Sequence, residues 1–416
     1  MQGQKNPIVV VGAGIVGVST ALHLQRMGER VLLLDRQGPA AGTSYGNAGI
    51  LACSAVVPVV TPGIMSRAPK MLMDENGPLF MRWSYLPRML PFLQKYIASS
   101  KNEVVEHIAR GLQPLLADGL EQHQDISKGS RASEILHPST YLYLYRDKAG
   151  FEGDAYGWNL RRENGYSWET AEGGEVREIE PDLNDDYRYA VLLKNHGFIH
   201  KPGNYVQALT DTFLENGGDL RIGTVVDISE NNDGLTVELK QGDRLAAHKV
   251  VLATGVWSNE LAQKIDVTVP METERGYHIE LDNPSVMPRN PLMDASGKFV
   301  VTPMGDSIRF AGVVEFGGLE APQSEGPLAL LKRGAKNLLP DLELTDVREW
   351  LGHRPAPADS LPILGHAPKN RNIILAYGHH HIGMTAGPKT GLLAAQLAAG
   401  RKPDIDLSAY APDRTL

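Results

Sequence analysis

Residues 8–35, IVVVGAGIVGVSTALHLQRMGERVLLLD, decide the fold of this 416-residue chain. The continuous apolar run at 8–11 predicts a short buried strand, and the apolar spacing after the glycines predicts a helix that ends at Gly28. Residues 31–34 form a second continuous apolar run, closed by Asp35. Because strands of this kind joined by a helix are typical of parallel sheets covered on both faces, the sequence predicts an α/β fold.

The glycines between this strand and helix form a dinucleotide-binding motif. Gly12, Gly14 and Gly17 have the GxGxxG spacing, which allows a tight turn, a close approach of backbone N–H groups to a pyrophosphate, and close helix–strand packing. The positive end of the helix then faces the phosphates. Asp35 ends the second strand, where its carboxylate is expected to hold ribose hydroxyls.

Two further segments favour FAD over NAD as the dinucleotide. The run TSYGNAG at 43–49 offers small polar residues and glycines to the second phosphate and the flavin side of FAD, and VVLATGVW at 250–257 resembles the turn that passes the nucleotide in FAD proteins. The sequence has no second GxGxxG, which argues against a separate NAD(P)H domain. Cys53 is the only cysteine, so we expect a buried thiol, a non-covalent FAD and no multi-thiolate metal site.

Charge and hydropathy bear on partners and location. The chain has 41 Lys and Arg against 49 Asp and Glu, a net charge of −8, and such a field disfavours binding to nucleic acid. The first apolar run leads straight into a glycine turn and so does not fit a secretory leader. No uninterrupted apolar stretch reaches the roughly 18 residues of a membrane span. These patterns predict a cytoplasmic protein.

The middle of the chain predicts a different architecture from its ends. Residues 140–145, TYLYLY, alternate with period two and predict a half-buried antiparallel strand. Further predicted elements are a helix at 203–217, a strand at 220–228, a β-meander at 233–255, several short strands within 268–315, a strand at 373–377 and a helix at 385–399. We therefore expect a second domain of α+β type, formed mainly by antiparallel strands.

The domains are expected to be discontinuous. The predicted nucleotide-binding domain comprises residues 1–55, 196–265 and 350–416. The predicted substrate domain comprises residues 56–195 and 266–349.

Taken together, these features resemble the D-amino-acid oxidase superfamily of flavoproteins, and within it the bacterial D-amino-acid dehydrogenase and glycine oxidase branch. The likeness covers nearly the whole length. Beyond the N-terminal glycine motif, it rests on TSYGNAG (43–49), GFIHKPGNYVQAL (197–209), ATGVWS (253–258), RGYHIE (275–280), RPAPADSLPILG (354–365) and YGHHHIGMTAGPKTG (377–391). The resemblance implies a Rossmann-like FAD-binding domain of glutathione-reductase type with an inserted antiparallel-sheet substrate domain.

The resemblance also implies a substrate site. Arg354 matches the arginine that binds the substrate carboxylate in the glycine oxidase branch, where a bidentate pair fixes the α-carbon against the flavin. Tyr277 and His278 are expected beside that carboxylate, with simple packing as the alternative for each. His380 stands where D-amino-acid dehydrogenases usually have a glycine, so we expect its side chain over the flavin. Glu315 is expected to be a solvated strand carboxylate, with ammonium binding as the alternative.

The turn at 378–383 implies the remaining cofactor contacts. In the resemblance it passes along the flavin, and the next helix points its N-terminus at the N1–C2=O edge, where negative charge develops on reduction. Adjacent histidines project in different directions, so no metal site is expected. The expected cofactor contacts are Gly12, Gly14, Ile15, Val16, Gly17, Asp35, Arg36, Thr43, Ser44, Asn47, Ala48, Gly49, Ile50, Val226, Thr254, Gly255, Trp257, Gly378, His379, His381, Ile382, Gly383, Met384 and Thr385.

The implied activity is FAD-dependent oxidation of the C–N bond of a small carboxylated amine, with a D-amino acid first. The flavin carries the redox chemistry, so the absence of an acid–base pair or a catalytic triad agrees with this activity. The alternatives are a secondary amine resembling sarcosine or proline, a 2-hydroxy acid, and a non-catalytic flavin subunit. A tRNA-modifying flavoprotein is a further alternative, against which the net charge argues. The electron acceptor is oxygen, a quinone or a carrier protein.

Residues 66–101 differ in charge from the rest of the chain. Six basic residues stand against Asp74 and Glu75, a local charge of +4, among many aromatic and apolar residues. A basic, aromatic, amphipathic segment suits the surface of an anionic membrane. The alternative, which we favour from the sequence, is a helical lid packed on the substrate domain.

Overall fold

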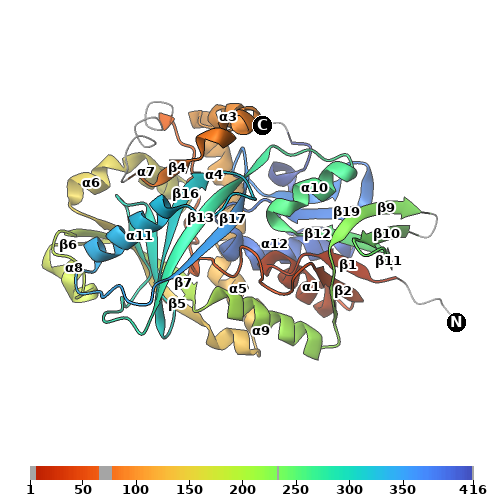
Figure 1. Ribbon diagram of the computed structural model, residues 1–416, viewed down its shortest axis with the longest axis horizontal. Coiled ribbons are helices and arrows are strands. Elements are labelled where there is room, and N and C mark those ends of the chain that lie inside the picture. Colours follow the sequence, from red (N-terminus) through yellow and green to blue (C-terminus); the bar gives the residue numbers. More distant parts are fainter. Residues whose placement is uncertain (1–5, 65–76, 232–233, 415–416) are drawn as a thin grey trace.

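The computed structural model describes residues 6–64, 77–231 and 234–414, in which a parallel sheet lies beside a larger mixed sheet (Figure 1). The parallel sheet has the strand order β18-β19-β12-β1-β2-β8. Its strands are β1 (Ile8–Val11), β2 (Val31–Asp35), β8 (Asp219–Ile222), β12 (Lys249–Leu252), β18 (Ile363–Ala367) and β19 (Asn370–Tyr377). All neighbours are parallel except β18 and β19.

Each face of this sheet is buried by a different layer. Ile8 and Val10 point into a core shared with helices, whereas Val9 and Val11 point into a core shared with a small antiparallel sheet. The helices are α1 (Ile15–Arg26), α9 (Pro202–Glu215) and α12 (Gly383–Ala398). The opposite layer contains β9 (Val225–Asn231), β10 (Gly234–Leu239), β11 (Arg244–Ala247) and α10 (Ser258–Lys264). The continuous apolar strands therefore form a sheet covered on both faces, as predicted.

The second sheet has ten strands and is mostly antiparallel. Its main path is β17-β13-β16-β15-β14-β5-β7-β3, with β4 beside β16 and β6 beside β7. The strands are β3 (Ile50–Leu51), β4 (Leu79–Met81), β5 (Leu136–Tyr145), β6 (Glu169–Glu172), β7 (Tyr189–Ile199), β13 (Met271–Asp282), β14 (Leu292–Asp294), β15 (Phe299–Pro303), β16 (Ser307–Phe316) and β17 (Arg348–Pro357). Helix α11 (Glu325–Leu338) covers one face through a core that includes Ile279, Phe310 and Leu331 (Figure 1).

Further helices pack around these two sheets. They are α3 (Leu86–Ala98), α4 (Asn102–Leu116), α5 (Gly119–Ser127), α6 (Lys148–Gly153), α7 (Ala155–Glu163) and α8 (Gly174–Ile179), with the short 3₁₀ helices η1 (Trp83–Tyr85), η2 (Arg131–Glu134), η3 (Gly255–Trp257) and η4 (Ser408–Tyr410). Val105, Leu112 and Leu116 of α4 belong to the same core as α1 and α12. Among the helices of the described residues, none is long and apolar enough to cross a membrane.

Most predicted elements are confirmed, with two corrections. The alternating segment 140–145 is the second half of β5 and pairs antiparallel with β7. The single strand predicted at 220–228 is wrong, because the chain turns after Ile222 and β9 joins another sheet. The predicted meander at 233–255 is likewise shortened, since its last strand, β12, enters the parallel sheet. The domain limits stay a prediction: α4 packs with the nucleotide-binding core and β17 lies in the larger sheet.

Helix α12 contains a proline whose effect is compensated by a neighbouring helix. Pro388 has no N–H, so the carbonyl of Met384, four residues earlier, loses its usual helical donor. Nε2 of His123 in α5 lies 2.8 Å from that carbonyl oxygen and donates to it, while its Nδ1 accepts from the Tyr205 hydroxyl at 2.8 Å. Burial lowers the pKa of His123 to about 4, which keeps the ring neutral in this arrangement.

We expect His123→Phe to lower the free energy of unfolding by about 1–3 kcal/mol, because it leaves the Met384 carbonyl without a donor. In a Pro388→Ala background, residue 388 regains an N–H that can bond to this carbonyl, so the same substitution should cost about 1 kcal/mol less. Urea unfolding of the holoprotein measures both effects. His107→Phe, at an exposed position of α4, is the control and should have little effect. Equal losses in both backgrounds would contradict this account.

Candidate cofactor and substrate site

A cavity of about 440 Å³ lies at the carboxyl ends of the parallel strands and the starts of α1 and α12, a size that suits a small-molecule or cofactor site. The predicted residues that line it are Gly12, Gly14, Ile15, Val16, Asp35, Arg36, Thr43, Ser44, Asn47, Val226, Thr254, Gly255, Trp257, His379, His380, Gly383 and Met384. The predicted residues outside its wall are Gly17, Ala48, Gly49, Ile50, Gly378, His381, Ile382 and Thr385, together with Tyr277, His278 and Arg354.

The glycine motif forms the wall as its spacing predicts. Gly12 has φ +107°, and a Cβ there would lie 2.4 Å from the Ala253 carbonyl oxygen. A Cβ on Gly17 would lie 1.8 Å from the Gly12 carbonyl oxygen, so Gly17 serves the close packing of the turn on α1. At the start of α1, the backbone N–H of Ile15 donates to Ser44 Oγ at 3.1 Å. The helix start is thus free of bulky side chains and carries a positive partial charge.

Asp35 lines the cavity, and hydrogen bonds fix the orientation of its carboxylate. Its Oδ2 accepts from the Ala13 N–H at 2.8 Å, and its Oδ1 accepts from the N–H groups of Gln37 and Gly38. These bonds fix the carboxylate beside the turn that the ribose of a dinucleotide would follow. Beside it, the Arg36 guanidinium lies 3.7 Å from the centroid of a Trp257 ring, and both residues line the cavity.

The sequence interpretation missed about half of the wall. The missed residues are Val11, Leu34, Gln37, Ala41, Gly42, Gly223, Thr224, Val225, Lys240, Ala253, Glu260, Leu261, Lys264, Pro355, Ala376 and Tyr377. Two sets of these missed residues could have been found from the sequence, because they lie at strand ends. Residues 223–225 follow the end of β8, and residues 376–377 end β19. Ligands of open α/β sheets bind beyond the carboxyl ends of parallel strands, so assigning β8 to the parallel sheet would have indicated the first group.

In the turn at 378–383, His379 and His380 line the cavity and His381 does not. His379 lines the cavity, and its Nε2 lies 3.0 Å from Thr390 Oγ1, while burial lowers its pKa to about 4. His381 is exposed, and its Nδ1 lies 3.0 Å from Nδ1 of His380. Thr385 is buried behind the wall, where its hydroxyl accepts from the Ala52 N–H and joins α12 to β3. Thr385 therefore supports the start of α12, and Gly383 and Met384 face the cavity.

His380 connects the cavity to the larger sheet. It has φ +48°, and its N–H donates to the Pro355 carbonyl at 2.8 Å. Its Nε2 lies 2.6 Å from Oε2 of Glu274 in β13, and both side chains are buried. The Tyr96 hydroxyl of α3 donates to Oε1 of the same carboxylate at 2.9 Å. Burial alone would raise the pKa of Glu274, but His380, Arg354 and Tyr96 lower it to about 2. Glu274 is therefore a buried carboxylate anion.

Arg354 lies opposite Glu274 in the pairing of β13 with β17. Its side chain is half-buried, and its guanidinium donates to the carbonyls of Gly312 and Val313, at 3.1 and 3.0 Å. These two residues have positive φ values of +145° and +47°, at a bulge where β16 pairs with β13. A Cβ on Gly276 would lie 2.4 Å from Cζ of Arg354, so glycine leaves the space in which the guanidinium sits.

Tyr277 and Glu315 lie on the opposite face of the sheet. The Tyr277 hydroxyl donates to Oε2 of Glu315 at 2.5 Å, and Arg275 Nε lies 3.2 Å from the same oxygen. Ser324 Oγ donates to the other oxygen of Glu315 at 2.5 Å. Glu315 is only 3% exposed, so the expectation of a solvated carboxylate is wrong. Because side chains alternate along β13, Tyr277 faces α11 while Glu274 faces the cavity side.

His278 and Cys53 are also placed away from the cavity wall. His278 stacks on Trp350 with a centroid distance of 5.1 Å, its Nδ1 lies 3.0 Å from the Gly46 carbonyl oxygen, and burial lowers its pKa to about 3. Cys53 is buried, as predicted, and burial raises the pKa of its thiol to about 11. A thiol of this kind is not a nucleophile at neutral pH.

The family described as FAD dependent oxidoreductase matches residues 7–397. The chain belongs to this family. A D-amino-acid oxidase from Bradyrhizobium diazoefficiens is 35% identical, over 98% of this chain and 99% of that protein. A D-amino acid dehydrogenase from the same organism is 28% identical, over 98% of each chain. The glycine oxidase structure from Geobacillus kaustophilus superposes with a TM-score of 0.74 at 22% identity, covering 99% of both chains.

The family confirms FAD as the cofactor and the predicted fold, in which a Rossmann-like region adjoins a mainly antiparallel sheet. The residues that line the cavity are also suited to bind FAD, independently of the family match. Gly12 and Gly14 leave the start of α1 open, and Asp35 presents an oriented carboxylate where a ribose is expected. The start of α12 forms the other end of the wall through Gly383 and Met384.

We expect Glu274→Gln to destabilise this flavoprotein by about 3–5 kcal/mol near neutral pH, because it removes one partner of a buried pair. The Glu274 pKa is lowered to about 2 from a usual value of 4.5, so its contribution is present above pH 4.5 and is lost as the pH falls through about 2. The Tm difference between wild type and variant should therefore narrow as the pH is lowered from 5 toward 2.

Glu272→Gln is the matched control, two residues earlier on the same strand. Its carboxyl accepts from Tyr85 and has a pKa raised by burial, so the Tm gap to wild type should not narrow over this pH range. A Tm difference between wild type and Glu274→Gln that stays constant from neutral to acid pH would show that Glu274 is not held as an anion.

Proposed function

We propose that this flavoprotein oxidises the C–N bond of a small D-amino acid to an imine, which hydrolyses to a 2-keto acid. The observation that carries the proposal is the half-buried Arg354, set opposite Glu274, whose carboxylate also pairs with the cavity residue His380. The relative named D-amino-acid oxidase, which matches nearly the whole chain at 35% identity, supports the choice of substrate. Bound FAD would supply the acceptor for the hydride that leaves the α-carbon.

Arg354 is suited to bind the substrate carboxylate. Its two Nη groups donate to backbone carbonyls, and each Nη carries a second N–H that remains for a ligand. A guanidinium whose direction is already fixed by a bulge loses little freedom when it binds a carboxylate. The bidentate pair would fix the α-carbon, and thereby select among substrates by where the side chain must point.

His380 and Glu274 are proposed to hold the wall next to this carboxylate. The buried Glu274 anion orients the imidazole from one side, and the Pro355 carbonyl holds the backbone of His380. The Arg354 guanidinium would then lie beside the substrate carboxylate, and the Glu274 anion offsets its positive charge. Tyr277, on the far face of β13, would support the strand rather than contact the substrate.

Helix α3 is proposed to cover the substrate end of the site. Met89, Phe92 and Tyr96 form a core with Phe316 and Ala358, and Tyr96 reaches Glu274. This packing supports the lid interpretation for residues 77–101; the charged residues Arg67, Lys70, Asp74 and Glu75 lie outside the described residues. A cover that excludes water strengthens the charge pairs beneath it.

The outer face of this cover has the features of a membrane contact. Trp83 is 64% and Leu90 48% exposed, and Arg88 and Lys95 are exposed on the same segment. Arg82 does not belong to this face, because its side chain is bonded to Pro322, Ser324 and Glu315. We propose that the outer face binds an anionic membrane surface, where a quinone would serve as the electron acceptor.

The substrate proposal is tested by the flavin spectrum of the holoenzyme under anaerobic conditions. We expect D-amino acids to bleach it, and L-amino, N-methylamino and 2-hydroxy acids not to. Arg354→Met should lower kcat/KM for the D-amino acid about 100-fold, through loss of a charge-assisted bidentate pair, while Arg354→Lys should lose less. Arg371→Met, at an exposed position, is the control.

Bleaching by only one of the other classes would assign that class as the substrate and overturn the D-amino acid proposal. A holoenzyme that no class bleaches would favour a non-catalytic flavin subunit. Mixing the bleached enzyme with oxygen or with a soluble quinone analogue then identifies the acceptor by its rate of reoxidation.

The membrane proposal is tested by co-sedimentation with vesicles that contain anionic lipid. We expect binding of the wild type to fall about tenfold or more when Arg88 and Lys95 are replaced by serine, since each basic residue near such a surface contributes about 1 kcal/mol. Replacement of the exposed basic residues Lys148 and Lys194, far along the chain from α3, is the charge-matched control. Binding that is absent, or equal in all variants, would contradict the proposal.

A further inference from the structure

The loop at 43–49 shapes the cavity, and its two ends are bonded to other segments: Thr43 Oγ1 donates to the His353 carbonyl, and the Gly49 carbonyl accepts from the Ile199 N–H. Thr43, Ser44 and Asn47 line the cavity, and Ser44 Oγ accepts from the Ile15 N–H at the start of α1. The position of this loop therefore sets the space around the helix start. Within the loop, the Asn47 side chain accepts from the Gly49 N–H, a local bond that leaves the backbone carbonyls of 45–47 free to accept from elsewhere.

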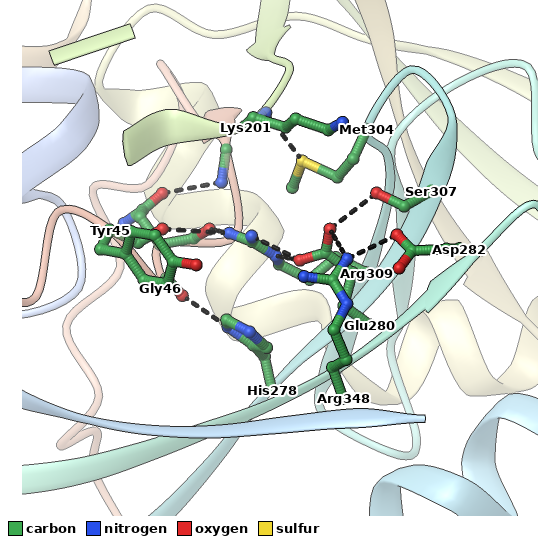
Figure 2. A network of polar contacts seen from close by, with 12 residues as sticks. Tyr45, Gly46, Lys201, His278, Glu280, Asp282, Met304, Ser307, Arg309 and Arg348 are labelled. Atoms are coloured by element: carbon green, nitrogen blue, oxygen red, sulfur yellow. Dashed lines mark hydrogen bonds and ion pairs between the residues drawn. The ribbon is translucent and has the colours of Figure 1, made fainter. Parts of the chain in front are cut away.

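Three successive carbonyls of the loop accept hydrogen bonds from the larger sheet. Arg309 Nη1 donates to the carbonyl of Asn47 at 2.5 Å and lies 3.4 Å from that of Tyr45. Nδ1 of His278 lies 3.0 Å from the Gly46 carbonyl oxygen between them, and must donate because a carbonyl only accepts. Figure 2 shows His278 and Arg309 reaching from the sheet toward Tyr45 and Gly46.

Arg309 is itself fixed by a buried carboxylate. Its Nε and Nη2 donate to Oε2 of Glu280 at 2.9 and 2.6 Å, and both side chains are buried (Figure 2). Oε1 of Glu280 accepts from Ser307 Oγ at 2.6 Å and from Arg348 Nη2 at 3.0 Å. Burial opposes ionisation of Glu280, but Arg309, Ser307 and Arg348 lower its pKa, so the pair keeps its charges. The direction of the Arg309 fork is thus set before any ligand binds.

Packing also fixes the loop at this point. A Cβ on Gly46 would lie 2.2 Å from two ring carbons of Trp350, so the loop passes directly over that ring. His278 stacks on the same ring, with 17° between the two planes. The bond from His278 and the contact with Trp350 therefore act on the same peptide of the loop.

We propose that His278, Glu280 and Arg309, which we call the loop clamp, position the loop at 43–49 for FAD. None of the three side chains of the loop clamp lines the cavity, and they reach its wall only through the backbone of the loop, so they are positioning residues. It lies on the sheet that also holds the proposed substrate site, and it makes retention of FAD depend on side chains of that sheet. The inference needs FAD binding but not the proposed substrate.

The first test compares FAD release from purified holoenzymes, followed by the rise of flavin fluorescence after dilution. Arg309→Met should release FAD about 10- to 100-fold faster, through the loss of charge-assisted bonds to the loop. His278→Phe, which keeps the ring on Trp350 but removes the donor, should show a smaller increase. Arg348→Met is the matched control, because Arg348 contacts the same carboxylate from the exposed side without touching the loop.

The second test is hydrogen exchange of the peptide that contains residues 43–49, which reads the loop directly and does not depend on catalysis. In Arg309→Met and His278→Phe this peptide should exchange faster, with the remainder of the chain unchanged. If Arg309→Met does not fold because Glu280 is left unpaired, the pair Arg309→Met with Glu280→Gln removes both charges and replaces it. A normal release rate with normal exchange of this peptide, or equal effects of Arg348→Met, would overturn the proposal.

A failure of the substrate proposal would look different. The flavin would remain unreduced by D-amino acids while release and exchange still separated the clamp variants from the control. If even the wild type retained no FAD, exchange of the loop peptide alone would decide whether the clamp holds the loop.

Discussion

The antiparallel pairing of β13 with β17 is the constraint on which the site depends. It brings Glu274 opposite Arg354, His278 opposite Trp350 and Glu280 opposite Arg348. Because alternate residues share a face of a strand, all of these side chains lie on the side of the sheet that meets the cofactor region. A shift of one residue in the register of β13 would turn Tyr277 toward the cofactor region. It would also bury the charged side chains of Glu274 and Glu280 against α11.

This face of β13 carries ionised groups that are costly to bury alone. Glu274 lies between His380, Arg354 and Tyr96, and Glu280 between Arg309 and Ser307. Replacing one member would leave an unpaired charge, whereas the complete sets are satisfied and directional. Such sets contribute geometry more than stability. Here each one ties the larger sheet to a segment of the cavity wall: the first to the turn at 378–383, the second to the loop at 43–49.

The sequence predicted the cofactor end of the site better than the substrate end, for a physical reason. Gly12, Gly14 and Asp35 act through local geometry, since strand, turn and helix follow one another in the chain. The positions of Arg354 and Tyr277 depend instead on the registers of three strands and on the bulge at 312–313. The hydrophobic pattern of the sequence does not reveal this bulge. Adjacent positions such as Tyr277 and His278 were both expected at the substrate, although a strand sends them to opposite faces. The burial of Glu315 was missed because its partners, Arg275 and Ser324, come from separate segments.

At His380, backbone strain is offset by contacts with other segments. At φ +48° glycine is unstrained, whereas a residue with a Cβ there costs about 1–2 kcal/mol. In this chain the backbone bond to Pro355 and the contact with Glu274 offset the strain. The histidine therefore belongs with Glu274 as one unit, and a glycine in its place would leave a buried carboxylate with one partner fewer. The two positions are thus expected to change together rather than singly.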